Sequence, residues 1–217
     1  MAAIAFQAMT IPDPSSQPKL ALPNVVIFAR WPEPGKAKTR LIPGFGAEGA
    51  AAIYTQLLEH TVKEALASGL AVELRVTGAP CSKFEDWFGT SLAKGSDLFI
   101  HDQGAGDLGA KMARVKAPAI LIGSDCPGLD ANLLLEAAQA LQTHDAVIGP
   151  AQDGGYYLLG IARPMPFLFE DMAWSTDQVL PDTLARLEAS EIAPAMLETL
   201  SDVDEPQDLV HFPQFKP

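Results

Sequence analysis

Short apolar runs alternate along the chain with longer segments in which apolar residues recur every three or four positions. The short runs are typical of strands buried on both faces, and the longer segments are typical of helices that pack one side on a sheet. This alternation predicts an α/β sandwich of three layers with a mostly parallel sheet. The predicted strands cover residues 24–29, 70–76, 97–101, 118–123, 145–149, 156–161 and part of 192–200, and the predicted helices cover 47–68, 84–88, 107–115, 130–141, 175–187 and 205–212.

Several helix ends carry their own signals. Gly69 is expected to end the helix over 47–68, and Asp130 is expected to cap the helix that follows it. Ser175 and Gln178 have the spacing of a capping box, which predicts a helix start at that point. Pro181 lies within the same predicted helix, and we expect a kink there because proline has no N–H to donate.

The composition predicts one globular domain in the cytoplasm. A chain of 217 residues with 48% hydrophobic residues can form a full core, which we assign to residues 24–217. Residues 1–23 include Pro12, Pro14 and Pro18 but no basic stretch followed by an apolar one, so we expect a flexible N-terminal extension rather than a secretory signal. No apolar run approaches the ~20 residues of a membrane-spanning helix.

The charge balance narrows the class of partner. A formal net charge of -12 argues against a nucleic-acid binder and against binding to an anionic membrane surface. The same charge favours a site that recruits metal cations. Cys81 and Cys126 lie far apart in the sequence and form no C-x-x-C pair, so we interpret both as reduced thiols that pack in the core.

One acidic residue stands directly after the buried strand over 118–123. Asp125 follows Ser124 at this point, and Pro127 prevents the strand from continuing. Ligands of open α/β sheets bind outside the carboxyl ends of the strands, and a carboxylate there can hold a divalent cation and, through it, a phosphate. The alternative is an aspartate that only caps a helix or a turn.

A basic loop follows the first predicted strand. Four of the 15 Lys and Arg residues fall between Arg30 and Arg40, although the protein is strongly acidic. Phosphates are the natural partners of such a cluster, and we assign Arg30, Gly35, Lys38, Thr39 and Arg40 to phosphate binding. The loop does not match a P-loop or a dinucleotide fingerprint, and the alternative is a solvated charged loop.

Three further segments contain candidate chemistry. Gly106 and Asp107 precede a predicted helix in a glycine-rich turn, where a phosphate could approach the backbone. Asp153 comes before two glycines and Tyr156, and the alternative to a functional carboxylate is an Asp-Gly hairpin turn. Trp174 and Asp177 flank a helix start, and here the alternative is a capped helix with a packed indole.

The segment from Ser201 to Leu209 is dense in carboxylates. Asp204 could cap the last predicted helix, and either Asp204 or Asp202 could be a second metal ligand. The four histidines show no spacing of metal ligands.

These segments together resemble the small bacterial glycosyltransferase-like proteins of GT-A type, a family once grouped as a domain of unknown function. Members are associated with radical SAM or selenium-domain proteins, and some are named as arsenosugar-biosynthesis glycosyltransferases. The resemblance spans positions 24 to about 210. Its motifs are Phe28-Ala29-Arg30, Pro34-Gly35, Lys38-Thr39-Arg40-Leu41, Gly106-Asp107-Leu108-Gly109, Gly123-Ser124-Asp125-Cys126-Pro127, Gly149-Pro150, Asp153-Gly154-Gly155-Tyr156-Tyr157, Trp174-Ser175-Thr176, and Asp202-Val203-Asp204 with Pro206 and Asp208-Leu209.

The resemblance implies a nucleotide-diphospho-sugar transferase fold with a divalent metal, Mg2+ or Mn2+, at Asp125. It also implies that Asp204 is the second metal aspartate. One departure stands out, because only residues 115–117 separate the predicted helix over 107–115 from the next strand, where relatives usually have a longer helix. We expect this departure to open or reshape one wall of the nucleotide site.

The leading interpretation is a metal-dependent transferase that uses a nucleotide-sugar donor and a small-molecule acceptor. Asp153 is the candidate for the catalytic carboxylate, and Tyr156, Trp174 and Asp177 are assigned to the acceptor side. A second interpretation is a nucleotidyltransferase that forms an activated compound from a nucleoside triphosphate. A third is a nucleotide-binding protein without catalysis.

Overall fold

A computed structural model describes residues 21–91 and 98–216 of the chain. Most of the expected N-terminal extension over 1–23 lies outside the described residues, and so does Asp97, the expected start of the third strand. In the described residues, no helix is both long enough and apolar enough to cross a membrane.

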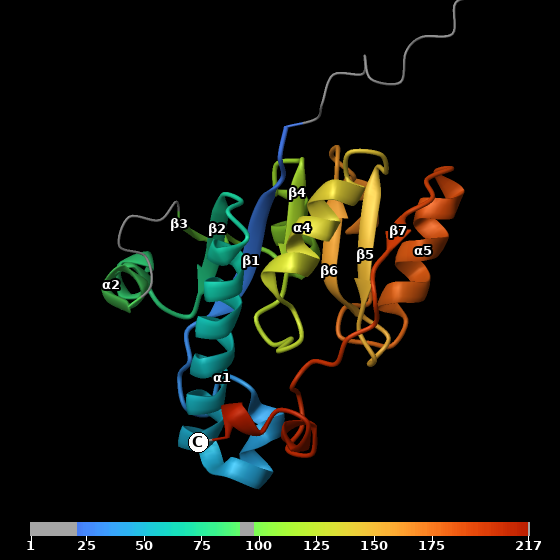
Figure 1. Ribbon diagram of the computed structural model, residues 1–217. Coiled ribbons are helices and arrows are strands. Elements are labelled where there is room, and N and C mark those ends of the chain that lie inside the picture. The colour runs from blue at the N-terminus through green and yellow to red at the C-terminus, as the bar shows by residue number, and fades with distance from the viewer. Residues whose placement is uncertain (1–20, 92–97, 217) are drawn as a thin grey trace, which may run out of the picture.

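Seven strands form one sheet in the order β3-β2-β1-β4-β6-β5-β7 (Figure 1). All neighbouring pairs are parallel except those of β6, which runs antiparallel to both β4 and β5. The expected α/β fold with a mostly parallel sheet is therefore confirmed. The strands are β1 (Asn24–Arg30), β2 (Val72–Thr77), β3 (Leu98–Asp102), β4 (Ala119–Ile122), β5 (Ala146–Pro150), β6 (Tyr156–Ile161) and β7 (Ala195–Met196).

Helices cover both faces of the sheet and complete three layers. Alternate residues of β1 point to opposite faces, so Val25 and Ile27 join one core and Val26 joins the other. The first core includes residues of α1 (Ile42–Ala67), α2 (Cys81–Ser91) and α4 (Ala131–Ala140). The second core includes residues of α3 (Leu108–Ala113), α5 (Val179–Ala189) and the short 3-10 helix η3 (Pro166–Leu168).

A third apolar cluster joins the C-terminal segment to the start of α1. Leu41 and Leu57 pack there with Val203, Leu209 and Phe215. Figure 1 shows the C-terminus lying beside the first turns of α1. The 3-10 helices η2 (Thr39–Leu41), η4 (Asp208–Val210) and η5 (Pro213–Phe215) lie in this region. The expected helix over 205–212 is thus a single 3-10 turn.

Two expectations about the start of α5 are wrong. The helix begins at Val179 after Gln178, which has no side-chain cap, so Ser175 and Gln178 form no capping box. The backbone N–H of Leu180 instead donates to the carbonyl oxygen of Gly154 at 3.0 Å, so a neighbouring loop satisfies the helix start. Pro181 lies in the first turn, where its missing N–H would have no partner within the helix, and the expected kink does not arise.

Candidate functional site

A cavity of about 520 Å³, which we call the main cavity, opens at the edge of the sheet where the parallel strands end. Its lining includes Arg30 at the end of β1, Thr77 at the end of β2, Gln103 after β3 and Asp125 after β4. Tyr156 joins them because β6 is antiparallel and begins at the same edge. The sheet therefore brings five strand ends to one cavity, in the place where open α/β sheets bind their ligands.

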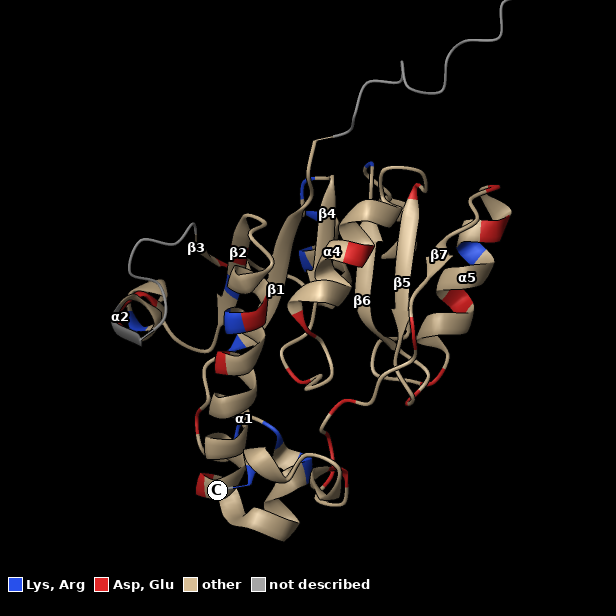
Figure 2. Cartoon of the chain, viewed as in Figure 1, with Lys and Arg blue, Asp and Glu red and all other residues tan. Residues whose placement is uncertain are grey.

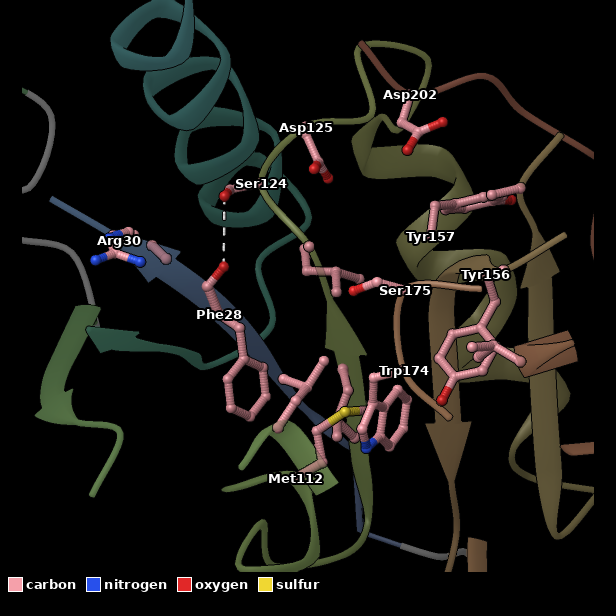
Figure 3. A pocket seen from close by; sticks show the side chains of 18 of the residues that line it. Phe28, Arg30, Met112, Ser124, Asp125, Tyr156, Tyr157, Trp174, Ser175 and Asp202 are labelled. Atoms are coloured by element: carbon pink, nitrogen blue, oxygen red, sulfur yellow. Dashed lines mark hydrogen bonds between the residues drawn. The ribbon is translucent and has the colours of Figure 1, made fainter. Parts of the chain in front are cut away.

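Local packing fixes Asp125 at this edge. All residues of β4 are buried, and the strand is followed by Gly123, where a Cβ would lie 2.8 Å from Oδ1 of Asp125. Gly123 therefore makes room for the carboxylate. The neighbouring Ser124 hydroxyl lies 2.9 Å from the Tyr54 hydroxyl and donates to the Phe28 carbonyl oxygen at 3.4 Å (Figure 3). These contacts join the ends of β1 and β4 to α1.

Tyr54, Ser124 and Gln103 are site residues that the sequence analysis did not assign. The Tyr54 hydroxyl accepts from the backbone N–H of Arg30 at 3.0 Å, so it positions the start of the basic loop. Nε2 of Gln103 donates to the carbonyl oxygens of Ala29 and Arg75. Tyr54 has helical spacing with core residues, and no local signal distinguishes it from them.

The two predicted metal aspartates lie together, and Lys38 lies between them. The backbone N–H of Val203 donates to the carbonyl oxygen of Asp125 at 2.8 Å, which brings Asp204 to Asp125. Nζ of Lys38 is 2.8 Å from Oδ2 of Asp125 and 3.1 Å from Oδ1 of Asp204. Arg40 also pairs with Asp204. Figure 2 shows the basic residues of this loop at the same end of the molecule as the acidic C-terminal segment.

The charges in this cluster shift the pKa values of its members. Burial acts to lower the pKa of Lys38, but the charges of Asp125 and Asp204 outweigh it, so the Lys38 pKa is raised. Burial acts to raise the pKa of Asp204, but Lys38 and Arg40 outweigh it, so the Asp204 pKa is lowered. Lys38 and Asp204 are therefore both charged at neutral pH, and the Lys38 ammonium is the cation that this pair of carboxylates holds.

The donor chemistry of the pair suits Mg2+ or Mn2+, because carboxylate oxygens are the ligands that these ions prefer. Asp125 and Asp204 converge on one cation position, the position of the Lys38 ammonium. In the described residues no group of three or more His, Cys, Asp or Glu side chains forms a metal cage. A metal at this position would need Lys38 to move aside, and phosphate oxygens of a ligand would complete its shell.

Asp202 is a third carboxylate near Asp125. It lines the main cavity together with Asp125 and Asp153, whereas Asp204 lines a neighbouring cavity of about 310 Å³. Burial and the negative charges of Asp125 and Asp153 raise the pKa of Asp202 to about 6. The sequence left Asp202 and Asp204 as alternatives, and the structure places both near Asp125, on either side of the buried Val203.

Asp153 lies in the turn between β5 and β6. These strands are antiparallel neighbours, so the hairpin interpretation of this segment is correct. Oδ1 of Asp153 accepts from the backbone N–H of Gly155 at 2.8 Å, and Gly154 has φ +90°, as a tight turn requires. Asp153 nevertheless lines the main cavity. It therefore shapes its own turn and also faces the place where a substrate would lie.

The acceptor-side residues are brought together only in part. Tyr156 and Trp174 line the main cavity, and Asp177 does not belong to its described lining. The backbone of Asp177 packs against the hairpin turn instead, because a Cβ on Gly154 would lie 2.7 Å from the Asp177 Cα.

Of the seven residues predicted to bind phosphate, six do not belong to the described lining of the main cavity: Gly35, Lys38, Thr39, Arg40, Gly106 and Asp107. Arg40 lines the neighbouring cavity instead. Gly35 and Gly106 have positive φ angles and shape their loops. Oδ1 of Asp107 accepts from the backbone N–H of Ala110 at 2.8 Å and caps α3. Arg30 lines the main cavity, and Lys38 contacts Asp125, which also lines it.

Comparison with known proteins supports the fold. A family model described as "Uncharacterized protein conserved in bacteria (DUF2064)" matches residues 61–176. A solved structure described as a "putative nucleotide-diphospho-sugar transferase" from Desulfovibrio desulfuricans G20 is 27% identical, with a TM-score of 0.75 over 86% of this chain and 85% of that chain. The expected nucleotide-diphospho-sugar transferase fold is thereby confirmed. A search of curated proteins finds no match.

Two more distant structures share the fold alone. The manganese complex of Rv0371C from Mycobacterium tuberculosis H37Rv is 14% identical, with a TM-score of 0.50 over 88% of this chain and 97% of that chain. CMP:2-keto-3-deoxy-manno-octonic acid synthetase, solved with CTP, is 15% identical, with a TM-score of 0.50 over 88% of this chain and 97% of that chain.

Proposed function

Since this chain belongs to the DUF2064 family of uncharacterized bacterial proteins, we propose a function from its own site: a metal-dependent transferase with a nucleotide-sugar donor. The observation that carries the proposal is the placement of Asp125. It lies at the centre of the row of strand ends, with Arg30 on one side and the Lys38–Asp204 cluster beside it. Phosphates bind where cations and an acid-held metal meet, and this edge has the cations and the carboxylates that would hold a metal.

The nucleotide-sugar transferase fold of the D. desulfuricans protein supports the same class of reaction. The manganese complex and the CTP complex show that proteins of this fold can hold these two kinds of ligand. Neither complex identifies a ligand of this chain. The proposal therefore depends on the residues at the strand ends.

In the proposed reaction, Arg30, Lys38 and Arg40 bind the diphosphate of the donor by charge-assisted hydrogen bonds. Asp125 and Asp204 would hold the metal, which supplies positive charge to the leaving diphosphate when bound. The acceptor hydroxyl forms a bond to the sugar carbon, and the bond from that carbon to the phosphate oxygen breaks. The electron pair leaves with the nucleoside diphosphate, and the hydroxyl proton passes to the Asp153 carboxylate.

A nucleotidyltransferase is the second candidate. The loop after β1 contains Arg30, Lys38 and Arg40, and three cations suit a triphosphate at least as well as a diphosphate. The two reactions release different products. A nucleotidyltransferase releases pyrophosphate from a nucleoside triphosphate, whereas a sugar transferase releases a nucleoside diphosphate.

Thermal unfolding with a ligand panel tests the proposal. Nucleoside mono-, di- and triphosphates and nucleotide-sugars are added with and without Mn2+. A ligand at one hundred times its Kd stabilises the fold by about 2.7 kcal/mol, so a true donor stands out.

We expect Asp125→Asn to remove the Mn2+-dependent stabilisation. Asp130→Asn is the matched control, because Asn caps α4 as well as Asp does. Unchanged Mn2+-dependent stabilisation in Asp125→Asn would contradict the metal assignment.

Turnover assays then separate catalysis from binding. With the donor that the panel selects, Asp153→Asn should keep the nucleotide affinity within a few-fold while kcat falls by about 10² or more. If Asp153 serves only its turn, Asn will replace it with little effect, because Asn is a good turn residue. Near-normal turnover in this variant would assign Asp153 to the hairpin alone.

A further inference from the structure

The main cavity has two ends of different chemistry. In Figure 3 the carboxylates of Asp125 and Asp202 lie at one end, and the side chains of Phe28, Met112 and Trp174 lie at the opposite end. We call the second end the apolar chamber. It is lined by Phe28, Leu108, Met112, Leu121, Tyr156 and Trp174.

The short helix α3 forms one wall of the chamber. This helix has six residues, and its Met112 packs with Leu121 of β4 in the core on this face of the sheet. Gly109 of α3 lets the opposite wall come close, since a Cβ there would lie 2.4 Å from the carbonyl oxygen of Phe169 and 3.0 Å from Nε1 of Trp174. Trp174 therefore packs directly on α3 at this wall, and the expected reshaping of the wall by the short segment over 115–117 stays a prediction.

The chamber does not suit the diphosphate of a donor. Lys38 and Arg40 lie at the carboxylate end, where both contact Asp204, and Lys111 of α3 also lines the main cavity. In the chamber, Met112 is 6% exposed and Leu121 is 2% exposed, and a phosphate among such groups would lose its hydration without compensation. A ligand body that gains by entering the chamber must therefore be apolar.

We propose that the apolar chamber binds the acceptor, and that the acceptor is an alcohol with an aromatic or branched alkyl body. This inference rests on the proposed function. The apolar body would lie between Met112 and Trp174, and its hydroxyl would extend toward Asp153 at the carboxylate end.

A series of phenols measures the chamber directly. Phenol, 4-methylphenol, 4-ethylphenol and 4-propylphenol are titrated into the full chain by calorimetry. Each buried methylene should raise the affinity about fourfold until the chamber is full. Leu108→Glu tests whether the phenols bind in the chamber. Leu108 is 40% exposed at the rim and begins α3, where a Glu is favourable for the helix. We expect Leu108→Glu to weaken 4-propylphenol binding at least tenfold.

Leu135→Glu is the matched control, because Leu135 is 45% exposed on α4, outside the described lining of the main cavity. It should leave the phenol series unchanged. A flat affinity series, or equal losses in both variants, would overturn the proposal. Competition tests the assignment of the chamber to the acceptor. We expect 4-propylphenol to bind together with ADP, CDP, GDP or UDP in the presence of Mn2+. Displacement of 4-propylphenol by one of these nucleotides would show that the donor, not the acceptor, binds in the chamber. If none of these nucleotides binds while the phenol series behaves as expected, the proposed function fails and the chamber stands as an apolar binding site.

Discussion

The side chain of Lys38 is 9% exposed, and the side chains of Asp125 and Asp204 on either side of it are 36% and 37% exposed. Lys38 also has a φ angle of +46°, in the left-handed region. A long side chain is held in one place here because two opposite charges and a fixed loop act on it together. At the scale of residues, this contact decides whether the two aspartates attract a further cation.

We expect Lys38→Met to destabilise the protein and to raise its affinity for Mn2+. Removing one partner from a buried ion pair costs 3–5 kcal/mol, and the partial exposure of the aspartates reduces this to about 2 kcal/mol. Because the carboxylates then face each other without a cation, Mn2+ should raise the Tm of Lys38→Met more than that of the wild type. Lys36→Met is the control, since Lys36 is 59% exposed and pairs with Glu33. Equal Mn2+ shifts in all three proteins would show that Lys38 does not compete with metal.

Asp202 should make stability depend on pH in a defined direction. Its pKa is raised to about 6 from an ordinary value of 3.8, so between these values the folded state holds a proton that the unfolded state has lost. The wild type therefore loses stability as the pH rises from about 4 to 6, and Asp202→Asn does not share this loss. Unfolding at pH 4 and pH 7.5 should show Asp202→Asn gaining in Tm over the wild type at the higher pH.

Asp204→Asn supplies a control of opposite sign. The pKa of Asp204 is lowered, so its ionised form stabilises the fold above the ordinary pKa and that stabilisation is lost in acid. This variant should lose more Tm at pH 7.5 than at low pH. A difference between wild type and Asp202→Asn that stays constant with pH would show that the Asp202 pKa is not raised.

At the scale of elements, α3 combines a capped helix start with a wall of the chamber. Its N-terminus is capped by Asp107, and its buried side forms one wall of the apolar chamber. Gly109 lies between the capped N-terminus and the chamber wall, and the segment from Phe169 to Trp174 packs directly on its Cα. Gly109, the last residue of the Gly106-Asp107-Leu108-Gly109 motif, therefore serves helix-to-loop packing.

We expect Gly109→Ala to destabilise the fold by about 1–3 kcal/mol, because the new Cβ would overlap the backbone of Phe169 and push Trp174. The displaced indole should also lower 4-propylphenol affinity. Gly89→Ala is the matched control in α2, where nothing lies within 4 Å of an added Cβ and Ala is the better helix former. It should leave stability unchanged or slightly higher. Denaturant titration of both variants measures the difference, and equal effects would argue against close packing at Gly109.

At the scale of the whole molecule, the site is assembled from both ends of the described chain. The loop after β1 supplies Lys38, the centre supplies Asp125, and the C-terminal segment supplies Asp202 and Asp204. The C-terminal segment is anchored by Leu209 and Phe215, which pack with Leu41 and Leu57 near the start of α1. One apolar cluster therefore holds the basic loop and the acidic segment in register.

We expect Phe215→Ala to cost about 3 kcal/mol of stability, because Phe215 is 6% exposed and its ring packs edge-on to His60. Loosening the segment should also weaken Mn2+-dependent nucleotide binding, since Asp204 lies on it. Val210→Ala is the control from the same segment, where Val210 is 67% exposed. Loss of stability with full nucleotide affinity would show that the anchor and the site are independent.

The sequence by itself determined the elements and the strand end that bears the site. Apolar periodicity gave the strands within a few residues, because burial on both faces demands continuous apolar runs, and it placed Asp125 after β4. The sheet edge followed from parallel pairing alone.

The tertiary structure decided everything that depends on distant partners. Lys38 lies between Asp125 and Asp204 because segments 87 and 166 residues away in the chain meet there. The start of α5 is satisfied by the hairpin carbonyl of Gly154 rather than by Ser175, and the chamber wall is closed by Trp174 against Gly109. Local propensity contains no information about such contacts, since each is set by which surfaces the sheet brings together.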